Sequence, residues 1–465
     1  MSIQRDAHIT FLTTLMNHII FIGYVLSGLN LAPLHAILFI MGEVQVHIQS
    51  MAFKGYGVAR IEGKVVFVPH SVTGDKAWVQ IIEEKKNYII GRLTRLIEPS
   101  PWRVNPPCPY FGVCGGCQWQ HIDYSVHGEL KKKILEEILM RLGGLEEIPP
   151  ITVTPSPDAY AYRVRVQLKV KGNIIGYYQE GSNHIVDIDH CPISDPLVNR
   201  IILLLRKQLP SLSPVKEIEI NVSPEEEKGV LILHALSSHQ GFEMFLKEVL
   251  RNHPMVKGLA LVRKGRFDLF GDPFLNFSIP LSEPGRGRKI RLRTSPKSFF
   301  QVNLKQNQTL IETVLNFSEV KENERVLDLY AGIGNLTLPL AIEAKEIVGI
   351  EENSMAVEDG RFNAEENKIS HCEFIPGKVE DILKYWTREK PDLVVLDPPR
   401  AGSKWITDQV ARLKPKRIVY VSCEPTHLSR DLRLFSENGY HLQRLCLVDM
   451  FPQTYHMEVV GLLAR

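Results

Sequence analysis

Alternating apolar and polar residues between positions 43 and 98 predict a run of short β-strands. The candidate strands are separated by turns rich in glycine and aspartate, and they read EVQVHIQS, GYGVARI, KVVFVPH, AWVQIIEE and YIIGRLTRLI. Short strands at this spacing are typical of a small barrel of the oligonucleotide-binding kind, which often binds RNA. A small barrel without a nucleic-acid role is the alternative.

The pattern changes twice further along the chain. A proline-rich linker, EPSPWRVNPP, is followed by an amphipathic helix over residues 130–142 and by mixed strands and helices over 161–276, which suits an α+β unit. From residue 296 to 465 strands and helices alternate regularly, which predicts a parallel, doubly wound, Rossmann-like sheet. We therefore expect a multidomain α/β protein with the divisions 1–41, 42–99, 100–295 and 296–465.

Residues 1–41 form an apolar extension with no charged side chain after Asp6. The stretch is long enough to span a bilayer, which needs about 20 apolar residues. Several polar residues dilute it, and neither a charged n-region nor a cleavage site is convincing. A translation start assigned too far upstream is the favoured interpretation, with Met41 beginning the first strand; a membrane anchor is the alternative.

Composition adds limited information. The chain has 465 residues, is 44% hydrophobic and carries a net charge of +2, which is ordinary for a soluble globular protein. A basic stretch from Arg286 to Lys297 is interpreted as a solvated loop, although such a stripe can contact phosphates. Seven cysteines without regular pairing argue against a secreted disulfide framework and favour a cytoplasmic location.

Three of those cysteines lie close together in CPYFGVCGGCQWQH, as Cys108, Cys114 and Cys117. Close free cysteines usually bind metal, and three thiolates in a glycine-rich loop with a distant fourth suit an iron–sulfur cluster. Cys191, which precedes a proline as Cys108 does, is the predicted fourth ligand. We expect a [4Fe–4S] cluster, with zinc as the alternative.

A cofactor site is predicted after position 325. The segment RVLDLYAGIGNLTLPLA reads as strand, glycine-rich turn and helix. Asp328, Glu351 and Asp397 each end a predicted strand, and the carboxyl ends of parallel strands share one edge of a sheet. Thr337 stands where a dinucleotide fingerprint needs a small residue, so S-adenosylmethionine is the favoured ligand.

A fourth strand, RIVYVSCEP, places Cys423 at the same edge. A thiolate that adds to C6 of a pyrimidine makes C5 nucleophilic toward a methyl donor, and a base must then remove the C5 proton. Glu458 is the predicted base and His456 is its rival.

These motifs together resemble the RNA (uracil-5-)-methyltransferases, specifically the iron–sulfur branch that acts on 23S ribosomal RNA. The resemblance covers residues 42–465 and rests on SPKSFFQVN, VLDLYAGIGNLTLP, VVLDPPRAG, VYVSCEPTHLSRD, DMFPQTYHMEVV and the cysteine motif. Residues 43–98 resemble the TRAM domain, an RNA-binding barrel of that family.

The resemblance implies a role for each matching residue. Cys423 would be the nucleophile and Glu458 the proton acceptor, while the cofactor contacts would be Gln301, Tyr330, Glu351, Asp397 and Asn335. Cys108, Cys114, Cys117 and Cys191 would ligate the cluster. The expected partner is RNA, with no obligate protein partner, and the expected state is a monomer.

The sequence departs from the family pattern at a few positions. Glu424 follows Cys423 where the family commonly has asparagine, so we expect it to raise the thiol pKa. Lys378 stands in the stretch where some family members place an asparagine near the adenine, so the resemblance does not assign an adenine contact there.

Two other functions stay open, and two further enzyme classes are disfavoured. The chain could modify transfer RNA, or it could bind RNA with an inactive methyltransferase fold. An enzyme acting on an exocyclic amine or on cytosine C5 is disfavoured, because Arg400 follows Pro399 and no cysteine lies beside the prolines.

Overall fold

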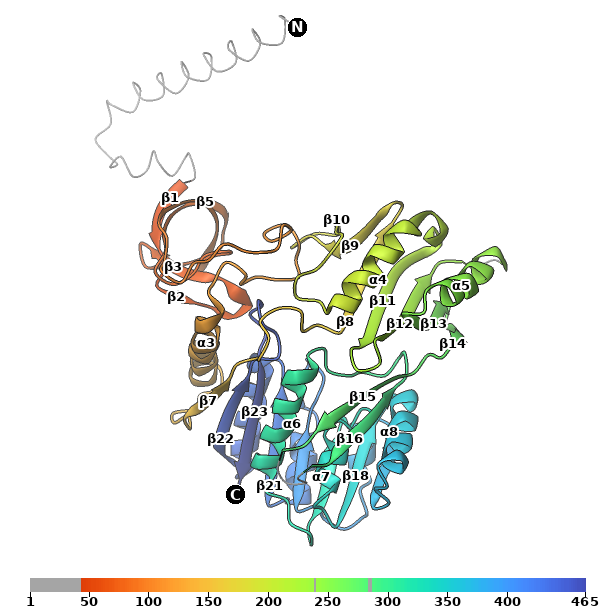
Figure 1. Ribbon diagram of the computed structural model, residues 1–465. Helices are drawn as coiled ribbons and strands as arrows, with labels where there is room; N and C mark the ends of the chain where they lie inside the picture. Colours follow the sequence, from red (N-terminus) through yellow and green to blue (C-terminus); the bar gives the residue numbers. More distant parts are fainter. Residues whose placement is uncertain (1–42, 238–239, 283–286) are drawn as a thin grey trace, which may run out of the picture.

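The computed structural model describes residues 43–237, 240–282 and 287–465 (Figure 1). The apolar extension with both of its interpretations, and Arg286 of the basic stretch, lie outside the described residues. Among the helices that are described, none combines the length and apolar composition needed to cross a bilayer.

The first sheet has six short strands in the order β1-β5-β6-β4-β3-β2. Their bounds are β1 Glu43–His47, β2 Ser50–Met51, β3 Gly57–Ile61, β4 Lys64–Val68, β5 Lys76–Glu84 and β6 Tyr88–Glu98, with a 3-10 turn η1 at Phe53–Gly55. Val46, Val66 and Val79 belong to its small buried core, as the alternating sequence pattern predicts.

A second sheet of seven strands lies beside the first at the top of the molecule (Figure 1), in the order β10-β9-β8-β11-β12-β13-β14. Its strands are β8 Arg165–Lys171, β9 Ile174–Tyr178, β10 Ile185–Asp187, β11 Val215–Ser223, β12 Lys228–Ala235, β13 Val256–Arg263 and β14 Arg266–Gly271. Two helices pack on it, α4 Pro196–Lys207 and α5 Gln240–Asn252, and the 3-10 turn η3 is Leu209–Leu212. A hairpin of β15 Leu275–Pro280 and β16 Lys289–Thr294 follows.

The C-terminal sheet has eight strands in the order β19-β18-β17-β20-β21-β23-β22-β7. Its strands are β17 Arg325–Leu329, β18 Glu346–Glu351, β19 Cys372–Pro376, β20 Leu393–Leu396, β21 Arg417–Ser422, β22 His441–Val448, β23 Glu458–Ala464 and β7 Ile151–Thr154. The helices along this half are α6 Leu304–Ser318, α7 Thr337–Ala341, α8 Ser354–Glu366, α9 Val379–Lys384, α10 Thr407–Leu413 and α11 Pro425–Glu437.

The cysteine segment leads through the 3-10 turn η2 (Tyr124–Val126) into α3 (His127–Arg141). Trp119 and the apolar face of α3 share one buried core with the C-terminal sheet and with Met51 of β2. This helix therefore joins the N-terminal sheet to the C-terminal sheet.

Two features differ from the sequence-based expectation. The predicted parallel order holds from β17 to β21, but β23 runs antiparallel to β21 and β22, because the short link after Val448 leaves no room for a helical crossover. The predicted solvated loop before Lys297 is in fact strand β16, where Arg291 pairs with Glu366 and Arg293 with Asp359. Residues 100–295 contribute β7 to the last sheet, so the domain divisions stay a prediction.

Candidate active site

The turn after β17 brings the backbone into an unusual conformation at the predicted cofactor site. Tyr330 has φ of 67°, which is rare for a bulky residue, and Gly334 has φ of 91°. A Cβ on Gly334 would lie 3.1 Å from the Phe374 ring, so the turn needs glycine there. Glu351 holds this turn, because its carboxylate accepts hydrogen bonds from the amides of Gly332 (3.0 Å) and Asn353 (2.8 Å).

An acidic crevice opens above this turn. It is lined by Gln301, Asp328, Tyr330, Asn335 and Asp397, together with Phe299 and Phe300. Thr337 donates a 2.6 Å hydrogen bond to Asp328 Oδ2, while Asp328 Oδ1 is buried without a hydrogen-bond partner among the described residues. The pKa of Asp328 is raised to about 7, mainly by burial, with smaller contributions from the nearby Asp397 and Glu351. An unsatisfied buried carboxylate oxygen fits a cationic ligand such as S-adenosylmethionine.

The five predicted cofactor residues are not equivalent. Gln301, Tyr330 and Asp397 line the crevice, whereas the Glu351 carboxylate is engaged by the turn itself. The Asn335 amide also lines the crevice but forms two reciprocal hydrogen bonds with Asn307 of α6, at 2.8 and 2.9 Å. This pair uses one N–H and one oxygen lone pair of Asn335, so the amide keeps one of each for a ligand.

Cys423 and Glu458 lie opposite one another across two adjacent strands. The antiparallel register pairs Ser422 of β21 with Val459 of β23, so the next position in this register sets Cys423 against Glu458. Directly opposed residues of such a pair have Cβ atoms about 5 Å apart. Asp397 follows the neighbouring strand β20 and lies close enough to raise the pKa of both groups.

Burial dominates the electrostatics of this pair. The pKa of the Cys423 thiol is raised to about 12, mainly by burial and then by Glu458 and Asp397, while Arg400 acts to lower it. Burial and Asp397 likewise raise the pKa of Glu458 well above its usual value. The sequence predicts Glu424 as the acid that acts on the thiol; this is wrong, since Glu458 and Asp397 do so and Glu424 accepts a hydrogen bond from Thr426.

The rival base, His456, lies in a more crowded place. Its ring packs on Tyr455 (centroids 4.2 Å apart) and Phe451 (5.9 Å). Burial, with Arg400 and Lys131, lowers its pKa to about 4. The imidazole is therefore neutral near pH 7 and a weak base.

The four predicted cluster ligands line one cavity of about 290 Å³. Cys191 raises the pKa of the Cys108, Cys114 and Cys117 thiols, beyond the effect of burial, which shows that the four lie close together. Cys191 comes from the loop before α4, where Asn199 accepts a 2.8 Å hydrogen bond from its amide.

The Gly-Gly pair shapes this loop in two ways. The Gly116 amide donates to the Cys114 sulfur, whereas the Gly115 amide donates to the Tyr178 carbonyl (3.0 Å). A Cβ on Gly115 would lie 3.1 Å from that carbonyl oxygen, so the loop needs glycine to approach β9.

Sequence reasoning missed two residues that the structure brings to the site. Arg400 lies by the cysteine cavity, where it lowers the Cys423 pKa. Lys131 of α3 is buried and contacts the loop between β22 and β23. Its position among the apolar residues Leu130, Ile134 and Leu135 of α3 is the sequence signal that could have revealed it.

Comparisons with known proteins agree with this geometry. Residues 279–465 match the family model described as tRNA (Uracil-5-)-methyltransferase, and residues 44–102 match that of the tRNA (uracil(54)-C(5))-methyltransferase TRAM domain. A 23S rRNA (uracil(1939)-C(5))-methyltransferase RlmD of Pectobacterium atrosepticum is 36% identical over 428 residues, covering 90% of this chain and 93% of the relative. An uncharacterized RNA methyltransferase of Aquifex aeolicus is 34% identical and covers 90% of this chain and 98% of its own.

A solved structure is also similar over most of the chain. It is the tRNA (uracil-54, C5)-methyltransferase of Pyrococcus abyssi in complex with S-adenosyl-L-homocysteine. The TM-score is 0.72 at 26% sequence identity, and the match covers 90% of this chain and all of the other.

The electrostatic contact between Cys423 and Glu458 is directly testable. Glu458→Gln removes the negative charge that Glu458 carries once it ionises, so the Cys423 pKa should fall and iodoacetamide should alkylate it faster, with a difference that grows as the pH is raised from 7 to 10. Each unit of decrease raises the thiolate fraction roughly tenfold below the pKa. Peptide mass spectrometry of timed samples would measure the rate.

Cys372 is the internal control, because burial and Asp328, not Glu458, raise its pKa to about 12. Its alkylation rate should be the same in both proteins. An unchanged Cys423 rate would show that Glu458 does not act on the thiol.

Proposed function

The chain belongs to the RNA (uracil-5-)-methyltransferase family and methylates C5 of a uridine in RNA with S-adenosylmethionine; we propose that this uridine lies in 23S ribosomal RNA and that Cys423 and Glu458 carry out the reaction. The observation that carries the proposal is the register that sets Cys423 against Glu458 at the edge of the sheet holding the acidic crevice. A nucleophile and a base are needed on one uracil ring, and this arrangement supplies both.

The chemistry divides between the two residues. The Cys423 thiol loses its proton and its sulfur bonds to C6 of the uracil, which makes C5 nucleophilic; Arg400 favours the thiolate. Gln301, Tyr330, Asp328 and Asp397, which line the crevice, would hold S-adenosylmethionine. When bound, it would supply the methyl group that C5 takes, and the methyl–sulfur bond would break as the C5–methyl bond forms. Glu458 then accepts the C5 proton, and the C6–S bond breaks to release Cys423. The raised pKa makes Glu458, once ionised, a stronger base than an exposed carboxylate.

The choice of ribosomal RNA follows the relatives that cover most of the chain. The Pectobacterium protein is named for a 23S rRNA uridine, whereas the Pyrococcus structure is named for uridine 54 of tRNA. The higher identity to the first favours 23S rRNA, and tRNA is the alternative. We also propose a monomeric, cytoplasmic enzyme, because one chain supplies the crevice, the thiol and the base.

The RNA would enter through a cleft of about 700 Å³. The cleft lies between the N-terminal sheet, the loop that carries Gly115 and Gly116, and the loop between β22 and β23. Tyr56, Tyr178 and Tyr455 line it, together with Lys54 and Lys169. Tyrosine rings stack on unpaired bases and lysines neutralise phosphates, which is how single-stranded RNA is usually held. We propose that the six-stranded sheet beside it closes into an OB-like TRAM barrel, because the Gln49 amide donates to Val58 of β3 (2.8 Å).

We propose a [4Fe–4S] cluster for Cys108, Cys114, Cys117 and Cys191. The ligands of one tetrahedral zinc ion lie about 3.8 Å apart. In the described chain, the group whose potential ligand atoms all lie within 4.8 Å of one another is Glu217, Glu219 and His234, not the cysteines. The wider setting of the cysteines favours a multi-iron cluster, and zinc stays the alternative. Such a cluster would offset the negative charge of its thiolate ligands, which matters here because burial and the neighbouring cysteines raise the pKa of Cys108, Cys114 and Cys117.

Two substitutions test the reaction. Cys423→Ser should abolish methylation while leaving S-adenosylmethionine binding unchanged, because the thiol serves the uracil rather than the cofactor. Glu458→Gln should stop after methylation, because an amide cannot accept the C5 proton. Radiolabelled methyl transfer to unmodified 23S rRNA and to unmodified tRNA, followed by denaturing gels and nucleoside mapping, measures both variants.

The expected product of Glu458→Gln is a labelled RNA–protein complex that survives denaturation. His456→Gln is the matched control and should turn over. A complex that accumulates only in His456→Gln would make the histidine the base. A Cys423→Ser enzyme with a tenth of normal turnover would contradict covalent catalysis, since tenfold is only about 1.4 kcal/mol of barrier. Label confined to tRNA would overturn the ribosomal substrate.

The cluster predicts a metal content. Protein purified without oxygen should contain iron and show broad absorption at roughly 400 nm. Cys191→Ala should lose most of both, while Cys446→Ala, which changes a buried cysteine of β22, should keep them. Stoichiometric zinc without iron in the native protein would rule the cluster out.

If RNA binds in this cleft, removing a tyrosine that lines it should weaken RNA binding. Tyr178 is 42% exposed in the cleft, so Tyr178→Ala should raise the KM for RNA about tenfold with little change in kcat, as expected for the loss of one stacked base. Tyr385→Ala changes a tyrosine that is 72% exposed away from the cleft and should leave KM unchanged. Equal effects of the two variants would argue against RNA in this cleft.

A further inference from the structure

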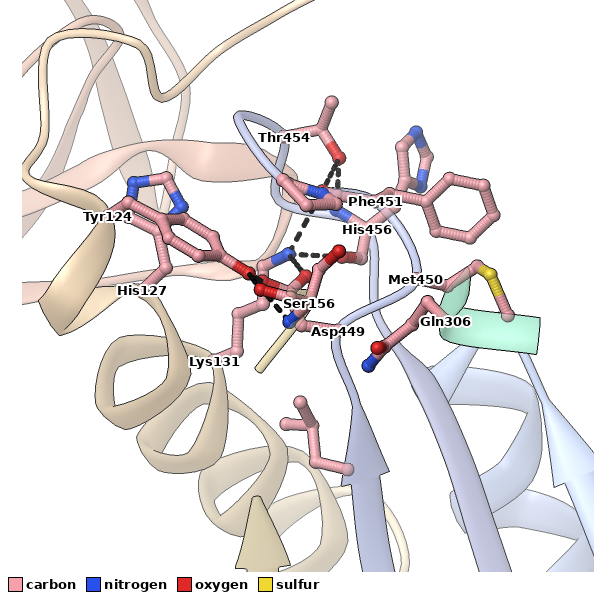
Figure 2. Close-up of polar contacts among 12 residues, drawn as sticks. Tyr124, His127, Lys131, Ser156, Gln306, Asp449, Met450, Phe451, Thr454 and His456 are labelled. Atoms are coloured by element: carbon pink, nitrogen blue, oxygen red, sulfur yellow. Dashed lines mark hydrogen bonds and ion pairs between the residues drawn. The ribbon is translucent and has the colours of Figure 1, made fainter. Parts of the chain in front are cut away.

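A buried lysine of α3, Lys131, contacts both ends of the loop between β22 and β23. Figure 2 shows the Lys131 side chain of α3 reaching up to this loop, which runs from residue 449 to 457. Its Nζ donates to Asp449 Oδ1 (2.6 Å), to the Phe451 carbonyl (3.2 Å) and to the His456 carbonyl (2.6 Å). An ammonium group has three protons, so all of them are used on this loop.

The pair formed by Lys131 and Asp449 is sealed from solvent. Their side chains are 0% and 1% exposed. The second Asp449 oxygen accepts a 2.9 Å hydrogen bond from the Tyr124 hydroxyl, which in turn accepts one from the Ser156 amide (2.8 Å). Buried ion pairs contribute little to stability compared with apolar residues of similar volume, but their geometry is strictly defined. The pair therefore contributes mainly by fixing the position of the loop, and little to the stability of the fold.

The contacts fall at the two ends of the loop. Asp449 follows Val448, whose register partner on β23 is Glu458, and His456 lies two residues before Glu458. Lys131 thus ties the end of β22 to the beginning of β23 at the position of the proposed base. Cys423 directly follows β21, and none of the three Lys131 contacts involves that strand.

We propose that Lys131 is a positioning residue for removal of the C5 proton: by fixing both ends of this loop, it holds the Glu458 carboxylate where the C5 proton leaves. The inference rests on the proposed role of Glu458. A shift of a catalytic group by about 1 Å can cost roughly a hundredfold in rate. Loss of Lys131 should therefore slow the resolution of the Cys423–uridine adduct and spare its formation.

A two-variant experiment separates positioning from stability. Lys131→Met leaves the Asp449 carboxylate buried and unpaired, which by itself can unfold a protein. Lys131→Met/Asp449→Asn removes both charges and keeps a side chain that can bond to Tyr124. The double variant should bind S-adenosylmethionine normally, form the labelled adduct within about threefold of the wild-type rate and resolve it at least about tenfold more slowly.

Lys133→Met is the matched control, because Lys133 lies on the same helix, is exposed and pairs only with Glu129 at 3.6 Å among the described residues. It should resolve the adduct at the wild-type rate. Rapid quenching after one turnover, with denaturing gels for the adduct and nucleoside analysis for free methyluridine, gives both rate constants. Equilibrium dialysis measures binding of the methyl donor.

Several results would overturn the proposal. Wild-type resolution in the double variant would exclude a role for Lys131 in the proton step. A proportional loss of formation and resolution, or lost binding of the methyl donor, would make Lys131 structural only. Glu458→Gln separates a failure of the Lys131 inference from a failure of the proposed role of Glu458. If Glu458→Gln accumulates adduct and the double variant does not, the Lys131 inference alone fails. If Glu458→Gln accumulates none, the assignment of the base fails.

Discussion

The antiparallel insertion of β23 between β21 and β22 is the constraint on which the rest of the site depends. Five parallel strands bring their carboxyl ends, and so Asp328, Asp397 and Cys423, to one edge of the sheet. A further parallel strand would begin at the opposite edge, about 20 Å away for a strand of this length. Because β23 runs the other way, its first residue, Glu458, lies at the same edge as the thiol. The proposed nucleophile and the proposed base come to the same edge only because one strand is reversed.

The same geometry concentrates negative charge. Asp328, Asp397 and Glu458 each have a raised pKa, and two of them raise the pKa of Cys423. A thiol with a pKa of about 12 is almost entirely protonated near neutral pH and reacts slowly with oxidants and electrophiles. A cation bound beside Asp328 and Asp397 would offset their charge and favour the thiolate. The site is therefore least reactive when it is empty and becomes reactive as its substrates arrive, with Arg400 as the permanent positive neighbour.

The sequence predicts much of this arrangement because the decisive residues lie at strand ends. Asp328, Asp397 and Cys423 follow runs of apolar residues, and parallel strands must bring such positions together. The sequence can mark Lys131 as a lysine on an apolar helix face, but it cannot show that its partners lie in the loop between β22 and β23. Nor can it show the pairing of Asn335 with Asn307, which depends on how α6 packs. The mistaken role of Glu424 has the same origin: adjacency along the chain suggested a contact that the fold gives to Glu458 on another strand. The addition of β7 from residues 151–154 also depends on tertiary packing alone.

The loop from 449 to 457 explains why a cysteine segment without an evident redox task lies beside a methyl-transfer site. Its Gln453 carbonyl accepts hydrogen bonds from the amides of Gln118 (3.2 Å) and Trp119 (3.0 Å), which directly follow Cys117. The loop's Tyr455 ring meets Phe53 of the N-terminal sheet, with centroids 5.4 Å apart. Three parts of the chain thus fix one loop, and each contact depends on a backbone that holds its shape. Residues 108–119 have little regular secondary structure of their own to provide that rigidity. A cluster joining four cysteines would provide it, and the role would need no electron transfer, since methylation of C5 neither consumes nor releases electrons.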